Sequence, residues 1–286
     1  MKVVLYGARG RLGELCTEAL RDTTVPDFVY AFQRDGTFVP RSQDGNEAPP
    51  LSLAGLKNAL RGQSVLFCDC SIDHSSTEAM ERHETAKRDL CAWLDARGAL
   101  RGAIGFSSGI ARLEGKRIRP HADHMRAYRA VKLAQERLFH NLRCPVFIPV
   151  LFTLIGPQTY RRQAAAWATV LRWRIEQAME AMLHDPFTRR FWVDEATVRQ
   201  ALVRFLEGTG PARVAEPLVD GVFSLDDVAG VELPGGHPRL HYAVGASTAW
   251  HDGDYLCEHA YPATSELANA LHQCLIPNRS ISDTPC

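Results

Sequence analysis

Short apolar runs alternate with longer segments of helical periodicity through the first half of the chain. The apolar runs lie at residues 3–6, 28–32, 65–69, 103–106 and 146–152. The helical segments lie at residues 11–21, 53–60, 76–97, 123–141 and 162–183. Strands that alternate with helices indicate βαβ units and a parallel sheet. Right-handed crossovers bring the carboxyl ends of such strands to one edge of the sheet, where ligands bind.

The alternation weakens beyond residue 155. Earlier in the chain, residues 34–50 predict a polar loop with a short strand at 37–39. A helix is expected at 194–207, short strands and loops at 214–257, and a frayed polar tail at 277–286. No sharp linker or internal repeat divides the sequence. We therefore expect a core domain over residues 1–160 and a small C-terminal substrate-binding lobe over residues 161–286, interleaved with the core.

The chain opens with a predicted strand, a glycine-rich turn and a helix. Glycines stand at 7, 10 and 13, in a Gly-x-x-Gly-x-x-Gly pattern. Gly7 permits a tight turn, Gly10 lets the backbone approach a pyrophosphate, and Gly13 lets the helix pack close to the strand. The start of the helix, at Arg11 and Leu12, offers N–H groups and partial positive charge to phosphates. This unit predicts an α/β Rossmann-type fold, a doubly wound parallel sheet of about six or seven strands that binds a dinucleotide.

Composition excludes several classes of partner. Acidic and basic residues number 33 each, so the net charge of zero gives no electrostatic footprint for nucleic acid or an anionic membrane. The longest apolar stretch, residues 144–156, contains prolines and is too short to span a bilayer. The 8 cysteines form no Cys-x-x-Cys pair and no signal peptide is evident, so we expect reduced thiols in a cytoplasmic protein.

Further features with chemical potential follow the glycine turn in order. Ser107 and Ser108 end a predicted strand, at the ligand edge of the sheet. Tyr128 and Lys132 share one face of a predicted helix, and Lys132 can supply the positive charge that a tyrosine needs to exchange protons near neutral pH. A Gly-Pro pair stands at 156–157 and Phe-Trp-Val-Asp-Glu at 191–195. Each feature has a structural alternative, because a Tyr-Lys pair can be an amphipathic contact and a Ser-Ser pair can form a turn.

In this order the motifs resemble those of the extended, nucleotide-sugar-modifying branch of the short-chain dehydrogenase/reductase superfamily. The resemblance covers roughly residues 1–207, and Glu136 also fits the helix pattern of that branch. It implies that Tyr128 exchanges a proton with a substrate hydroxyl or carbonyl and that Lys132 also binds the nicotinamide ribose. Ser108, with Ser107 in reserve, would hold the substrate oxygen. Hydride would pass to or from the nicotinamide.

The resemblance also implies a class of substrate. It indicates a reductase or epimerase that acts on a nucleotide-sugar or a similar small keto or hydroxy metabolite, and the chain length favours the reductase. Ser108-Gly109 lacks the following carboxylates of the dehydratases. The unusual stretch 68–71, in which Ser71 is expected to contact the cofactor, leaves a non-catalytic NAD(P)-binding sensor or scaffold as the alternative. The sequence leaves open whether the chain forms a homodimer.

The end of the second predicted strand bears on the choice of cofactor. NAD-specific sites place a carboxylate there, whereas this strand ends in Ala-Phe-Gln-Arg, with Asp35 adjacent. Arg34 can meet a 2′-phosphate, Arg9 lies where many NADP-dependent relatives carry a base, and Arg11 can assist. We therefore expect NADP, with NAD as the alternative.

Two weaker patterns are interpreted as structural features without a ligand. His121 and His124 flank Asp123, but a metal would need a further ligand in defined geometry, so we expect a solvated loop and no metal. The aromatic and basic segment 167–174 predicts an amphipathic packing helix.

Overall fold

The computed structural model divides the chain into two compact units. It describes residues 1–23, 26–42, 44–71, 77–112, 123–162, 171, 180–183, 189–210, 215–231, 239–242 and 265–274. The first unit comprises Met1–Leu151 and Thr197–Leu218, and the second Phe152–Ala196 and Val219–Cys286. The glycine turn and the residues Ser108, Tyr128 and Lys132 all belong to the first unit.

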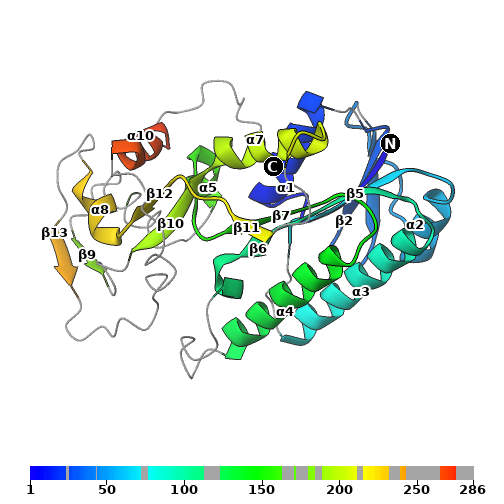
Figure 1. The fold of residues 1–286 in the computed structure, drawn as a ribbon, viewed down its shortest axis with the longest axis horizontal. Helices are drawn as coiled ribbons and strands as arrows, with labels where there is room; N and C mark the ends of the chain where they lie inside the picture. Colours follow the sequence, from blue (N-terminus) through cyan, green and yellow to red (C-terminus); the bar gives the residue numbers. More distant parts are fainter. Residues whose placement is uncertain are drawn as a thin grey trace. The chain divides into compact units, whose positions relative to one another are not determined.

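The first unit is built on a mostly parallel sheet. Its strands are β1 (Lys2–Tyr6), β2 (Phe28–Phe32), β3 (Phe38–Ser42), β4 (Val65–Asp69), β5 (Leu100–Gly105), β6 (Ser107–Ser108), β7 (Val146–Leu151) and β11 (Ala215–Pro217). They lie in the order β11-β7-β5-β4-β1-β2-β3, and β6 pairs with β7 (Figure 1). The strand order reverses direction beside β1, at the kind of switch point where α/β sheets bind ligands. The expected Rossmann-type architecture is confirmed.

The edge strand β3 adds an antiparallel pair to the expected parallel sheet. It runs antiparallel to β2, whereas the other paired strands of this sheet are parallel. The connection is too short for a helical crossover. Gly36 adopts a φ of +86°, and Asp35 Oδ1 accepts hydrogen bonds from the backbone N–H of Thr37 at 2.9 Å and from its hydroxyl at 2.7 Å. These local bonds close a hairpin, so the strand expected at 37–39 is longer than predicted and returns along β2.

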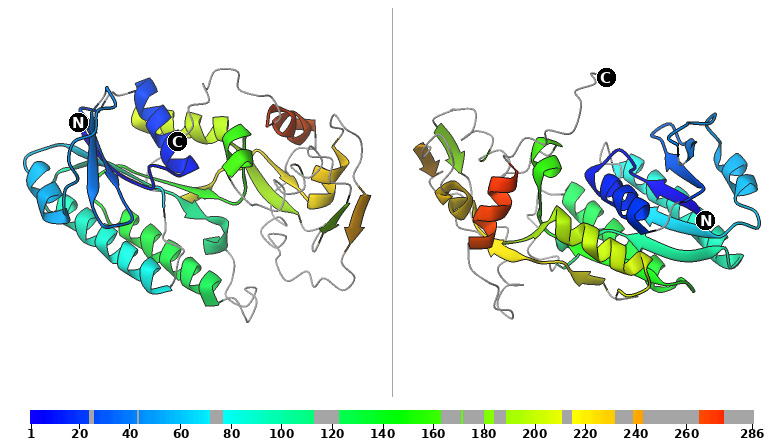
Figure 2. Two further views of the ribbon diagram at one scale, coloured as in Figure 1. Left: turned by 180° about the vertical axis from the view of Figure 1, so that it is seen from behind. Right: turned by 90° about the horizontal axis from the view of Figure 1, so that it is seen from above.

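Helices cover both faces of this sheet. One face carries α2 (Leu53–Ala59), α3 (Thr77–Ala96) and α4 (Asp123–His140), and the other carries α1 (Arg11–Thr23) and α7 (Glu195–Leu206) (Figure 1, Figure 2). A short 3-10 helix, Gly109–Arg112, follows β6. On the second face the ring of Phe205 stacks on that of Phe147, with centroids 5.5 Å apart. Within the described ranges, no helix is both long and apolar enough to cross a membrane.

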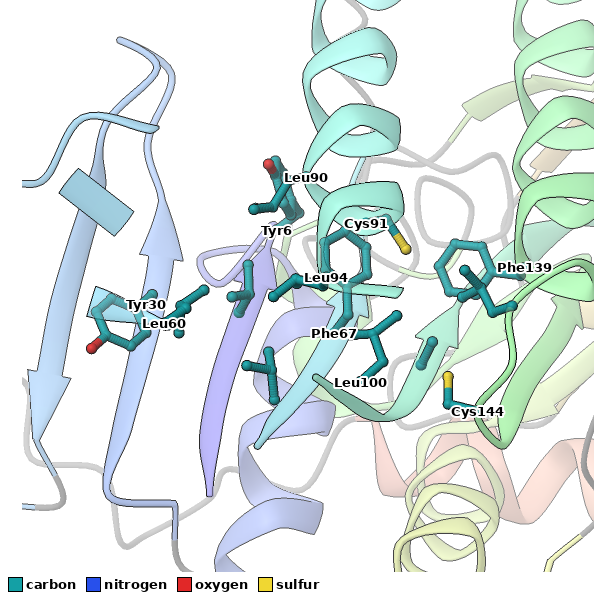
Figure 3. Packing of buried hydrophobic residues seen from close by; sticks show 14 of the residues in the cluster. Tyr6, Tyr30, Leu60, Phe67, Leu90, Cys91, Leu94, Leu100, Phe139 and Cys144 are labelled. Carbon is teal, nitrogen blue, oxygen red and sulfur yellow. The ribbon is translucent and has the colours of Figure 1, made fainter. Parts of the chain in front are cut away.

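The core beneath α3 and α4 determines where α4 lies. Leu90 and Leu94 from α3 are fully buried in one cluster with Phe67 of β4 and Phe139 of α4, whose ring centroids lie 6.2 Å apart (Figure 3). The ring of Phe139 also closes on Gly105, where a Cβ would lie only 2.9 Å from ring carbons. The missing side chain at Gly105 therefore lets α4 approach the carboxyl end of β5.

The second unit contains short elements. They are β8 (Leu154–Ile155), α5 (Pro157–Arg162), β9 (Glu180–Leu183), β10 (Arg190–Asp194), β12 (Gly221–Phe223), α8 (Leu225–Gly230), β13 (Arg239–Tyr242) and α10 (Ser265–Gln273). One sheet has the order β12-β10-β8, and β13 pairs with β9.

The helix expected over residues 162–183 is wrong at its C-terminal end. The structure has strand β9 there, paired in parallel with β13 so that Glu180 lies opposite Arg239. Pairing with a distant strand outweighs local helical periodicity at this point. Leu171 is helical, whereas residues 163–170, 172–179 and the tail 277–286 lie outside the described residues.

Gly13→Ala tests the close approach of α1 to the glycine turn. A Cβ at Gly13 would lie 2.2 Å from the backbone oxygen of Gly7 and 2.8 Å from Ala8 Cα. Because backbone atoms cannot rotate away, we expect a loss of roughly 1–3 kcal/mol in the free energy of unfolding. The matched control is Gly55→Ala in α2, whose Cβ would meet side-chain atoms no closer than 3.6 Å. That variant should gain about 0.5–1 kcal/mol. Urea denaturation measures both, and a Gly13→Ala protein as stable as Gly55→Ala contradicts the packing argument.

Candidate functional site

The glycine turn after β1 has little room for side chains. Gly7 adopts a φ of +79°, and a Cβ there would lie 2.6 Å from the Cβ of Ser71. The N–H of Gly10 donates to the carbonyl of Gly7 at 2.9 Å, which closes the turn. A Cβ at Gly13 would collide with the same carbonyl. Gly7 and Gly13 are thus required by the turn, and Gly7 lies directly against the chain that leaves β4.

The turn fits the pyrophosphate of a dinucleotide. Gly10 is exposed, and a Cβ at this position would meet only the Gly7 oxygen, at 3.3 Å. Leu12 and Gly13 lie in the first turn of α1, where backbone N–H groups have no acceptor within the helix. An open glycine beside such N–H groups is the arrangement that anionic phosphates need.

The three arginines near the turn differ in their surroundings. Arg9 is exposed on the glycine turn, and Arg34 is exposed in the hairpin turn after β2. Arg11 instead forms ion pairs along its own helix, with Glu14 at 3.3 Å and Glu18 at 3.1 Å. The exposed guanidinium group of Arg34 is therefore better placed to meet a phosphate than that of Arg11.

Asp35 is the carboxylate nearest the end of β2 in the sequence. Its hydrogen bonds from Thr37 lower the pKa of its carboxyl below the usual range. The carboxylate thus serves the hairpin turn. The last residue of β2 itself is Phe32.

Ser108, Tyr128 and Lys132 come together near the carboxyl end of β5. Ser108 lies on β6, and its side chain is hydrogen-bonded to that of Tyr128 on α4. Lys132 Nζ lies 5.9 Å from the centroid of the Tyr128 ring. It also donates a hydrogen bond to the carbonyl of Phe106, the residue between β5 and β6. A hydroxyl pair and an ammonium group thus gather at the ligand edge of the sheet.

Ser107 has a different set of contacts. Its buried hydroxyl donates to Glu136 on α4. The other carboxylate oxygen of Glu136 pairs with Arg112 at 3.0 Å, and Arg112 donates to the carbonyl of Ala215 at 3.0 Å. The Ser107 hydroxyl therefore helps to join β6, α4 and β11, and Ser108 is the serine that contacts Tyr128.

Burial dominates the electrostatics of the Tyr-Lys pair. It raises the pKa of Tyr128 above the usual range for a phenol, against the hydrogen bond with Ser108. Burial also lowers the pKa of Lys132 to about 8, against the opposing negative charge of Asp69. The pKa of Tyr128 is therefore raised and not lowered as expected, and the neutral phenol is favoured.

A buried polar cluster beside Lys132 was missed from the sequence. Asp69, at the end of β4, pairs with Lys87 of α3 at 2.8 Å, and Gln135 of α4 contacts both Asp69 and Lys132. One signal was present. Lys87 falls on the stripe of α3 that buries Met80, and a lysine on a buried stripe requires a buried acid.

The Gly-Pro and Phe-Trp-Val-Asp-Glu motifs meet in the second unit. Strands β8 and β10 pair in parallel, and Glu195 follows β10 directly. The carboxylate of Glu195 accepts from the backbone N–H of Thr159 at 2.7 Å. A Cβ at Gly156 would lie 2.2 Å from Glu195 Cδ, so the glycine makes room for the acid. These contacts are structural.

The remaining patterns carry no site in the described part of the chain. His121 and the side chain of His124 lie outside the described residues, as does segment 167–174 except for Leu171. Elsewhere in the described ranges, no group of His, Cys, Asp or Glu is arranged to hold a metal ion.

Comparison by sequence finds no relative. No protein-family model matches the chain, and no curated protein matches it significantly.

Comparison by structure finds many similar chains. The Bordetella bronchiseptica enzyme WbmH, solved with NAD⁺, has a TM-score of 0.60 at 16% identity, covering 96% of this chain and 98% of its own. The GDP-mannoheptose C4 reductase MlghC from Campylobacter jejuni, solved with NADP, has a TM-score of 0.63 at 10% identity and 96% coverage of each chain. The UDP-N-acetylglucosamine 4-epimerase from Bacillus cereus has a TM-score of 0.64 at 13% identity, covering 100% of this chain and 99% of its own. At such identities the likeness is one of architecture, and the chain has the Rossmann-type fold that these epimerases and reductases share.

Proposed function

We propose that the chain is an NADP-dependent reductase that acts on a keto carbon of a nucleotide-linked sugar or a similar small metabolite. The observation that carries the proposal is the meeting of Ser108, Tyr128 and Lys132 at the sheet edge to which the glycine turn also belongs. Support also comes from proteins of the same fold, such as the GDP-mannoheptose reductase with NADP bound. An epimerase that uses the same residues is the alternative reaction.

The chemistry assigns one task to each side chain. The bound nicotinamide supplies the hydride. Tyr128 donates its hydroxyl proton to the substrate carbonyl oxygen, and Ser108 orients that oxygen by a hydrogen bond. Lys132 uses two of its three N–H groups on Phe106 and Gln135, which leaves one for the ribose of the cofactor. The raised pKa of Tyr128 suits a reductase, because only the neutral phenol can donate a proton.

The preference for NADP rests on the exposed arginines. Strands β1 and β2 are parallel neighbours, so the turns that carry Arg9 and Arg34 emerge at the same edge of the sheet. A guanidinium group binds a phosphate through paired, charge-assisted hydrogen bonds. Asp35 lies three residues beyond Phe32, the last residue of β2, whereas NAD-specific sites place a carboxylate at the end of this strand. NAD stays the alternative cofactor.

Tyr128→Phe tests the proton donor. The variant keeps the ring but removes the hydroxyl, so turnover should fall about 10²–10⁴-fold with NADPH binding retained. Consumption of NADPH with a panel of nucleotide-linked keto-sugars, followed by absorbance, measures the rate. Stoichiometric consumption indicates a reductase, whereas epimerisation without net consumption indicates the alternative.

The control for this variant is Tyr30→Phe, which removes a hydroxyl from a core tyrosine of β2 and should leave turnover unchanged. Ser108→Ala should reduce turnover less than Tyr128→Phe, because it removes an orienting hydrogen bond and not the proton. A Tyr128→Phe protein that turns over at the parent rate ends the mechanism. A parent protein that binds NADPH but acts on no substrate in the panel supports a sensor or scaffold.

Arg34→Ala tests the choice of cofactor. Loss of a hydrogen-bonded charge pair corresponds to roughly 1.5–3 kcal/mol, so NADPH affinity should fall at least about tenfold, with NADH affinity unchanged. Arg61→Ala, at another exposed arginine, is the matched control and should alter neither affinity. Isothermal titration calorimetry measures both cofactors. Equal affinities of the parent for NADPH and NADH, unaffected by Arg34→Ala, refute the preference.

A further inference from the structure

An unbroken chain of hydrogen bonds links Lys132 to the backbone of Ser71, which lies against the glycine turn. Lys132 Nζ donates to Gln135 Oε1 at 3.1 Å, and Gln135 Nε2 donates to Asp69 Oδ2 at 2.5 Å. Lys87 Nζ lies 2.8 Å from Asp69 Oδ1 and 3.0 Å from Oδ2. The same ammonium group donates to the carbonyl of Ser71 at 2.7 Å. The chain of contacts therefore runs from α4 through β4 and α3 to the backbone that lies against Gly7.

All four side chains in this chain are removed from water. The exposed fractions are 2% for Asp69 and Lys87 and 5% for Lys132 and Gln135. Desolvating charged groups is costly, and a buried ion pair commonly contributes less stability than apolar side chains of similar volume would. Stability alone is therefore a weak reason for a buried amide and ion pair at this place.

We infer that Gln135, Asp69 and Lys87 are positioning residues that hold the Lys132 ammonium and join it to the backbone of Ser71, beside the glycine turn. Gln135 holds the ammonium directly, Asp69 holds the amide of Gln135, and Lys87 anchors Asp69 to Ser71. The inference rests on the proposed function, because it assigns Lys132 to cofactor binding. It adds three residues that touch neither the cofactor nor the reacting atoms.

The amide of Gln135 can serve this purpose in only one orientation. Its oxygen faces the Lys132 ammonium and its nitrogen faces the Asp69 carboxylate. The reverse orientation would set an N–H donor against an ammonium and an oxygen against a carboxylate, which is unfavourable at both ends. The carboxylate of Asp69 therefore determines which end of Gln135 meets Lys132.

The chain of contacts through Gln135, Asp69 and Lys87, called the relay below, should also affect the protonation of Lys132. The charged or titratable groups that act on it come from every neighbouring element: Asp69 and Cys70 at the end of β4, Glu84 and Lys87 of α3, and Tyr128 of its own helix. A carbonyl oxygen that accepts from an ammonium stabilises the charged form. Loss of the Gln135 oxygen should thus lower the pKa of Lys132. Cofactor affinity that depends on the ammonium is lost as the pH rises, and in such a variant this loss should begin at a lower pH than in the parent.

Gln135→Met tests the relay by NMR titration of lysine side chains. Lysines occur only at 2, 57, 87, 116 and 132, so protein with ¹³Cε-labelled lysine gives few resonances, and Lys132→Arg identifies that of Lys132. In the parent, the Lys132 resonance should titrate with a midpoint near the pKa of about 8. In Gln135→Met the midpoint should lie about one unit lower. Because the charged fraction at pH 8 then falls from about one half to about one tenth, NADPH affinity at pH 8 should fall about fivefold, which corresponds to about 1 kcal/mol.

The matched control is Gln200→Met, at an exposed glutamine of α7, which should change neither the midpoint nor the affinity. Gln135→Asn retains an amide that is too short to reach both partners and serves if Gln135→Met does not fold; its midpoint should also fall. An unchanged Lys132 midpoint in the folded Gln135 variant overturns the relay. A lowered midpoint in a protein whose parent binds no NADPH leaves the relay in place and refutes the proposed function instead.

Discussion

The parallel pairing of β1 with β4 is the constraint on which the site depends. The pairing sets Tyr6 opposite Asp69, so the chain leaves both strands at the same level of the sheet. From β1 it turns through Gly7 into α1 on one face, and from β4 it passes Ser71 toward α3 on the other. The two exits are so close that a Cβ at Gly7 would collide with Ser71. The glycine turn and a buried carboxylate thus lie side by side because the register of β1 against β4 brings the ends of the two strands together.

The buried acid at the end of β4 organises the helices beside it. Asp69 binds Lys87 of α3 and Gln135 of α4, and those helices pack side by side on the same face (Figure 1). Each partner satisfies a group that would be costly to bury alone. The apolar contacts of Phe139 bring α4 close to β5, and the polar contacts then decide the position of the Lys132 ammonium. Apolar packing thus places the whole helix, and polar contacts place a single ammonium group on it.

The same burial decides the protonation states of the Tyr-Lys pair. A phenol in an apolar setting keeps its proton, and an ammonium group in that setting tends to lose its proton. Tyr128 therefore keeps its proton, and Lys132 keeps its charge near neutral pH because its pKa stays at about 8. The proposed reduction uses this combination, since its proton comes from the neutral phenol while the ammonium binds the cofactor.

The local features of the chain were determined by the sequence. The strand, glycine turn and helix at the start, and the placement of Tyr128 and Lys132 on one helical face, depend on neighbouring residues and on helical spacing, so they were predicted correctly. Tertiary structure decided what depends on distant partners. The sequence favoured Ser108 over Ser107 by resemblance alone, and the contact of the Ser107 hydroxyl with Glu136 depends on the packing of α4 against β6. The link from Lys87 to Asp69 joins a helix to a strand. Such contacts are set by three-dimensional packing, which residue type and spacing do not encode.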